Sequence, residues 1–197
     1  MCSTRPTRHE IEAANAIKAR RCAKVDALEA LAAVVLRRLL GSVWHTTNSE
    51  RFQGILHSEA ILPEPIISDT ARWSTSRGSK WYPYVRTLGG ISLFDFRDFD
   101  PDQYSITNPA SSWREFVPYR SKWKEAVWIE IDTSQLGNTF ISGHDLLDRW
   151  RAQPVGNRLM PKIEAAHLGP LPQSAFKAAF LVREGSHELS TVELKKP

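Results

Sequence analysis

The chain has 197 residues, a mass of 22.3 kDa and a formal net charge of +4, which is enough length for one domain with a sizeable core and an appended arm. Hydrophobic residues make up 42% and charged residues 24%, and no apolar run approaches the roughly 20 residues that span a membrane, so we expect a soluble protein without a membrane partner. The two cysteines exclude a disulfide framework or a thiolate zinc site, and the N-terminus lacks the apolar segment of a secretory signal, so we expect a cytoplasmic location.

The N-terminal segment is predicted to be helical. Residues 9–40 contain neither proline nor glycine and are rich in alanine, which favours a helix. Leu28, Leu31, Val35 and Leu39 recur at helical spacing and predict an apolar stripe. Residues 1–40 also carry the whole basic excess, because the remaining basic and acidic residues balance. Such an arm either contacts nucleic acid or another acidic partner, or presents a solvated helix face.

A strand and a helix follow the arm. Val43–Thr46 reads as a short strand, and Asn48 with Ser49 is suited to cap a helix that continues to Leu56. His45 lies where the strand gives way to the helix, a place that often carries function. The alternative is a buried histidine that bonds to a backbone carbonyl.

The rest of the chain alternates strands and loops. Residues 68–80 are rich in hydroxyls and bases and predict either a ligand-facing lid or a solvated loop. A further helix is expected from about Ser142, ended by Pro154. Apolar and β-branched runs predict strands at Ile91–Phe96, Ala126–Asp132, Lys162–His167 and Lys177–Arg183, with an edge strand at Ser190–Leu194.

Glu164 is the acid that stands out in these strands. It is flanked by Ile163 and two alanines in a segment that predicts a buried strand, and a buried carboxylate is costly unless it is partnered. It is therefore a site candidate, with a glutamate at a strand edge facing water as the alternative. Glu130 and Asp132 resemble half of a metal-dependent nuclease site, but no lysine follows at the required spacing.

Three of these segments together resemble the ADP-ribosyltransferase fold of the H-x-T type, including DarT-like enzymes. They are His45-x-Thr47 with its helix, the Gly-Gly-Ile-Ser-Leu-Phe-Asp-Phe run ending at Phe96, and Pro-Lys-Ile-Glu ending at Glu164. The resemblance implies an α+β fold, a split β-sandwich of two small antiparallel sheets that binds NAD in the cleft between them. It covers about residues 43–183, so we divide the chain into a helical arm at 1–41 and a catalytic domain at 42–197.

The resemblance also implies roles for individual residues. Glu164 would hold the nicotinamide ribose as the catalytic acid, and His45 would bind the adenine-side ribose. The residues expected to shape or line the NAD site are Thr46, Thr47, Ser92 and either Phe94 or Phe96 as the ring that stacks on nicotinamide. One of Arg72, Arg77 and Arg86 would serve the site, with Arg72 the candidate for catalysis and Arg86 for cofactor binding.

The implied chemistry needs these groups. Breaking the nicotinamide–ribose bond builds positive charge on the sugar, which a carboxylate can stabilise while it accepts a proton from the incoming nucleophile. No metal is required, and the histidines show no metal-ligand spacing. Two departures matter: the second motif lacks a tyrosine, and Lys162 stands two residues before Glu164, which disfavours transfer to arginine side chains.

The predicted function is NAD-dependent ADP-ribosyl transfer, a glycosyltransferase reaction, with nucleic acid as the candidate acceptor. Family habit suggests a toxin or conflict factor with an antitoxin or inhibitor protein as partner. The alternatives are an NAD-dependent RNA 2′-phosphotransferase of the same fold and a non-catalytic binding module that retains the fold.

Overall fold

The computed structural model describes residues 7–72, 78–153, 158–186 and 188–195. Cys2 and Pro154 lie outside these ranges. Residues 73–77 of the predicted loop at 68–80, which include Arg77, also lie outside them.

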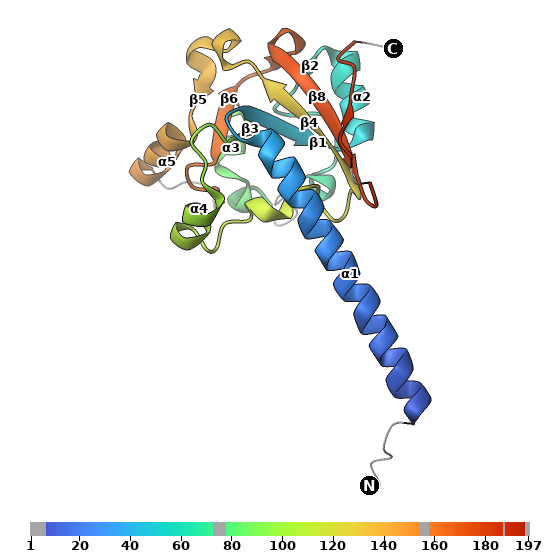
Figure 1. The fold of residues 1–197 in the computed structure, drawn as a ribbon. Coiled ribbons are helices and arrows are strands. Elements are labelled where there is room, and N and C mark those ends of the chain that lie inside the picture. Colours follow the sequence, from blue (N-terminus) through green and yellow to red (C-terminus); the bar gives the residue numbers. More distant parts are fainter. Residues whose placement is uncertain (1–6, 73–77, 154–157, 187, 196–197) are drawn as a thin grey trace.

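One long helix leads into the body. Helix α1 runs unbroken from Arg8 to Leu39 and begins with a capping box, in which the Thr7 side chain accepts from the Glu10 backbone and the Glu10 side chain accepts from Thr7. Figure 1 shows it extending well away from the body, so that its last turns alone reach the sheet. Leu31, Val35 and Leu39 are buried there, while Leu28 of the predicted stripe is 41% exposed. The stripe therefore packs over its C-terminal part.

Seven antiparallel-paired strands form the main sheet, in the order β5-β6-β3-β1-β4-β8-β9. Their bounds are β1 Val43–Thr47, β3 Gly90–Asp95, β4 Glu125–Ile131, β5 Phe140–Ile141, β6 Glu164–Leu168, β8 Phe176–Arg183 and β9 Ser190–Thr191. A second, two-stranded sheet pairs β2, Ala60–Ile61, with β7, Leu171–Pro172. The fold is thus α+β, as predicted.

Four shorter helices complete the described part of the chain, alongside several 3₁₀ turns. They are α2 Ser49–Ser58, α3 Tyr84–Thr87, α4 Pro101–Thr107 and α5 Gly143–Ala152. Asn48 caps α2 and Ser142 caps α5 through their side chains, as expected for these residue types. None of the helices in the described ranges is both long enough and apolar enough to cross a membrane.

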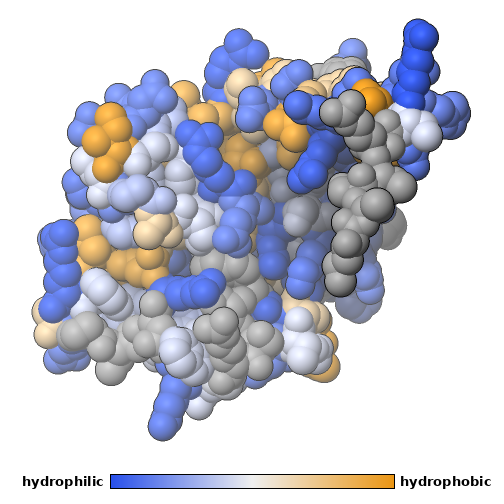
Figure 2. Space-filling model, turned by 90° about the horizontal axis from the view of Figure 1, so that it is seen from below, coloured by the Kyte–Doolittle hydropathy of each residue, from blue (hydrophilic) through white to orange (hydrophobic). Residues whose placement is uncertain are grey.

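The sheet is covered on both faces. Because side chains alternate along a strand, Trp44 and Phe94 pack on the face of α1, while Val43 and Leu93 pack on the face of α2. Aromatic rings dominate the α1 face, where Phe94 meets Phe96, Phe116 and Trp128. Hydrophobic residues on the outer surface are more dispersed, and in the view of Figure 2 they form separate patches among hydrophilic residues.

The main sheet is nearly divided between β1 and β3. These two strands pair at two positions alone, Val43 with Asp95 and Trp44 with Phe94. In contrast, β1 stays paired with β4 as far as Thr47, and β3 stays paired with β6 as far as Gly90. We predicted two small separate sheets; the two blocks are instead joined through this short ladder, and the separate sheet is the two-stranded one.

Candidate active site in the split between β1 and β3

A cavity of about 490 Å³ opens where β1 and β3 part. His45, Thr46 and Thr47 line it from β1, and Ser92 and Phe94 line it from β3. The volume lies within the roughly 300–1,000 Å³ that is usual for small-molecule sites. Both strands keep a hydrogen-bonded neighbour on their other side, so the sheet holds the β1 and β3 walls of the cavity.

His45 bridges the split. Its Nδ1 lies 3.2 Å from the backbone carbonyl oxygen of Ser92, and because a carbonyl oxygen can only accept, Nδ1–H is the donor. Burial lowers the pKa of His45 to about 4, although the bond to Ser92 opposes the shift, so the ring is neutral at pH 7. In this tautomer Nε2 is an acceptor that can receive a hydrogen bond from a ligand hydroxyl. The hydrogen bond to a backbone carbonyl that we expect of a structural histidine is therefore present, and the same imidazole ring also lines the cavity.

Glu164 lies at the base of the cavity with no exposed surface. Its Oε1 accepts the Ser92 hydroxyl at 2.8 Å, and its Oε2 accepts the Met160 backbone N–H at 3.0 Å. Burial raises the pKa of Glu164 to about 7, against the pull of these two hydrogen bonds. A carboxyl group with a pKa near the working pH can both take and release a proton, as a general base requires.

Ser92 connects the two titratable groups. Its carbonyl oxygen accepts from His45 and its hydroxyl donates to Glu164. This connection depends on the divergence of β1, because paired strands would use the Ser92 carbonyl in the ladder. The imidazole from the early strand and the acid from the late strand are thus brought to one cavity.

The neighbouring predicted residues divide between cavity and core. Thr46 and Thr47 line the cavity, and Thr46 Oγ1 is buried with no hydrogen-bond partner in the described ranges. Such an atom is costly to leave unpaired, and a ligand in the cavity could satisfy it. Phe94 also lines the cavity, whereas Phe96 is fully buried behind it against Phe99 and does not. Of the two candidate rings, Phe94 alone is placed to meet a ligand.

The predicted arginines are engaged with carboxylates. Arg86 uses all three guanidinium nitrogens, two on Glu64 and one on Asp69, at 2.9–3.1 Å. Arg72 binds the same Glu64 and donates to the Pro63 carbonyl oxygen. Hydrogen bonds from Arg86 and Arg72 hold the pKa of Glu64 below its ordinary value. Both arginines line the cavity, but their charge is balanced by these two acids.

The lining residues that were not predicted from the sequence include Arg51, Arg120 and Trp123. Arg51 lies in the first turn of α2, three residues after the cap Asn48, and the other two come from the segment before β4. The sequence feature that could have identified Arg51 as a site residue is its position six residues after His45. No sequence signal identified the other two, since they enter the site through tertiary folding.

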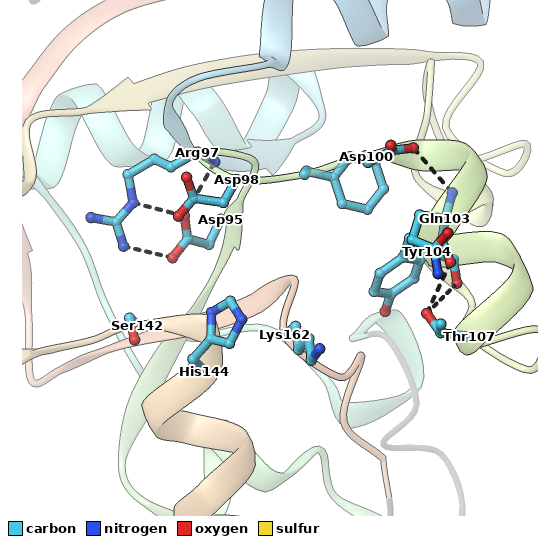
Figure 3. A pocket seen from close by; sticks show the side chains of 11 residues that line it. Asp95, Arg97, Asp98, Asp100, Gln103, Tyr104, Thr107, Ser142, His144 and Lys162 are labelled. Atoms are coloured by element: carbon cyan, nitrogen blue, oxygen red, sulfur yellow. Dashed lines mark hydrogen bonds and ion pairs between the residues drawn. The ribbon is translucent and has the colours of Figure 1, made fainter.

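A second cavity, of about 450 Å³, lies outside the predicted site. Figure 3 shows Arg97 paired with Asp95, with Ser142 and His144 at the start of α5 facing them. None of our predicted site residues lines it. Within the described ranges, no group of three or more His, Cys, Asp or Glu side chains is placed to hold a metal ion.

Two comparisons with known proteins found no relative of this chain. Neither the protein-family models nor the curated proteins include a match to this chain. The site is therefore interpreted from its own geometry.

One glycine fixes the turn that carries Glu164. A methyl group on Gly143 would lie 1.8 Å from the carbonyl oxygen of Lys162, which cannot move without shifting the turn from Met160 to Ile163.

We expect Gly143→Ala to lower the free energy of unfolding by about 1–3 kcal/mol, as other overpacked sites do. Urea unfolding measures this. Gly54→Ala in α2, where a methyl group meets no atom within 4 Å, is the control and should stabilise the fold by about 0.5–1 kcal/mol. Equal effects of the two substitutions would contradict the prediction.

Proposed function

We propose that the chain is an NAD-dependent ADP-ribosyltransferase. The observation that carries the proposal is the chain of contacts from His45 through Ser92 to Glu164, at a cavity formed where β1 and β3 part. A structural histidine or a surface glutamate does not require this arrangement. A neutral imidazole acceptor and a buried carboxyl group with a pKa near 7 suit a substrate that carries two ribose rings.

The residues present fit NAD in several respects. His45 Nε2 can accept a hydroxyl of the adenine-side ribose, and Glu164 can accept a hydroxyl of the nicotinamide ribose once Ser92 yields that position. Phe94 offers an apolar edge to the nicotinamide ring, and the unpaired Thr46 hydroxyl offers a polar contact nearby. Aromatic groups favour a planar cationic ring such as nicotinamide in NAD.

The proposed reaction follows from the charge of Glu164. The bond between nicotinamide nitrogen and ribose C1′ breaks, and the electron pair leaves with nicotinamide, which becomes neutral. The ribose then carries positive charge, which the Glu164 carboxylate stabilises in a site shielded from water. The acceptor attacks C1′, and Glu164 takes the proton that the acceptor loses.

The acceptor we propose is nucleic acid. Most of the basic excess in the first 40 residues lies on α1, and the hollow between α1 and the segment before β4 adds Arg114, Lys122 and Lys124. Arg120 lines both this hollow and the cavity, so basic side chains continue from the cavity towards α1. Positive charge along such a path attracts a phosphate backbone.

Incubation with NAD labelled in the adenylate part tests the proposal. With DNA, RNA and protein as three separate pools, we expect label to enter the DNA or the RNA pool, with release of free nicotinamide. Label in the protein pool alone would refute nucleic acid as the acceptor. If no pool is labelled and no nicotinamide is released, the chain is a binding module and not a transferase.

A further inference from the structure

Two arginines that the sequence did not identify meet over one tryptophan. The guanidinium carbons of Arg51 and Arg120 lie 5.8 and 5.1 Å from the centre of the Trp123 ring. Arg120 also lies 5.7 Å from the Phe116 ring. All four side chains line the cavity that contains His45 and Glu164.

The protein offsets these two charges only in part, through Glu50 near Arg51 and Glu115 near Arg120, both beyond ion-pair distance. In the part of the chain that the structure describes, no carboxylate lies within ion-pair distance of Arg51 or Arg120. Arg51 donates to the Ala71 carbonyl oxygen at 2.8 Å, which is a neutral acceptor. Burial lowers the pKa of both groups, and the charge of Arg51 lowers that of Arg120 further. Like charges gathered in a partly buried place are costly until an anion joins them.

The other two cavity arginines differ in this respect. Glu64 and Asp69 neutralise Arg72 and Arg86, and the three nitrogens of Arg86 are already used. The net positive charge of the cavity therefore lies at Arg51 and Arg120. Their partner must be negatively charged and offer several acceptor atoms, because guanidinium groups donate in a planar fork.

We propose that Arg51 and Arg120, stacked on Trp123, form the phosphate-binding subsite of this cavity. The inference rests on the proposed function in one respect: the phosphate belongs either to the diphosphate of NAD or to the backbone of the nucleic-acid acceptor. The Arg72–Arg86 cluster is then a structural clamp on the loop that contains Glu64 and Asp69.

Titration calorimetry with pyrophosphate tests the subsite without requiring turnover. We expect Arg51→Gln and Arg120→Gln each to weaken pyrophosphate binding about 10-fold or more, since each removes charge-assisted hydrogen bonds. Arg120→Lys, which keeps the charge and loses the fork, should fall between wild type and Arg120→Gln. Arg149→Gln is the matched control: Arg149 is exposed on α5, outside this cavity and outside the hollow beside α1, and its loss should leave binding unchanged.

Two further ligands identify the source of the phosphate. If the same variants weaken NAD binding, the subsite holds the dinucleotide; if they weaken binding of a short single-stranded oligodeoxynucleotide, it holds the acceptor. Both results support the subsite. Unchanged pyrophosphate binding in both glutamine variants, or no binding to the wild-type chain, would overturn it. A third result separates the two proposals. If pyrophosphate binds through these arginines but no nicotinamide is released from NAD, the subsite is supported and only the transferase proposal is refuted.

Discussion

Replacing Glu164 with glutamine should lower the rate of ADP-ribose transfer about 100-fold or more. The substitution removes the one carboxylate among the described residues that line the cavity, and losing a charge stabiliser of the transition state typically costs this much. The fold should persist, because the glutamine oxygen can accept the Met160 N–H while its amide group donates to the Ser92 hydroxyl.

Nicotinamide release under single-turnover conditions, with unfolding measured in parallel, checks this expectation. Glu130→Gln provides the control, since Glu130 is also buried in the sheet but pairs with Ser42 and Lys177 away from the cavity. Its transfer rate should stay near that of the wild type. If the two substitutions reduced the rate alike, Glu164 would have no special role.

The same Glu164→Gln substitution should also change how the free energy of unfolding varies with pH. Between pH 4.5 and 7, that variation should differ from the wild type's by about 3 kcal/mol. The pKa of Glu164 is about 7 in the folded chain against an ordinary 4.5, so between these pH values the folded state binds more protons than the unfolded state. The contribution of Glu164 to the wild-type free energy of unfolding therefore falls as pH rises from 4.5 to 7. The glutamine variant should not lose this stability. In the wild type the loss is about 1.4 kcal/mol for each unit by which folding raises the pKa of Glu164.

His45 acts in the opposite direction. Its pKa of about 4 in the folded chain lies below the ordinary 6.5, so its contribution to stability rises as pH increases from 4 to 6.5. In the wild-type chain the two slopes oppose each other, and removing Glu164 leaves the His45 slope alone. Urea unfolding of both chains at pH 4.5, 6 and 7.5 measures the difference, in which the other titrating groups cancel. A difference that stays constant with pH would show that Glu164 is not held in the protonated form.

The parts of this site that sequence alone predicted are those carried by strands. His45, Ser92 and Glu164 each lie in or next to an apolar run, and pairing of β1 with β3 and of β3 with β6 brings them together. Alternation placed Ser92, Phe94 and Phe96 on one face, but it cannot tell where the cavity ends and the core begins. Phe96 was therefore included, although it packs in the core.

The charged groups were harder to predict. A guanidinium group near a motif may serve a ligand or an ion pair, and the acids that decide this for Arg86 lie 22 and 17 residues earlier, at Glu64 and Asp69. Arg120 and Trp123 reach the cavity from a segment without regular structure, so no periodic pattern marks them. The prediction of two separate small sheets was also wrong in part, because two backbone pairs between β1 and β3 join the two blocks.

The crystal structure of the Glu164→Gln chain soaked with NAD would test the central claim most directly. We predict NAD in the split between β1 and β3, with a ribose hydroxyl donating to His45 Nε2 and the nicotinamide ring between Phe94 and residue 164. NAD bound instead in the cavity of Figure 3, or no NAD at saturating concentration, would contradict the account.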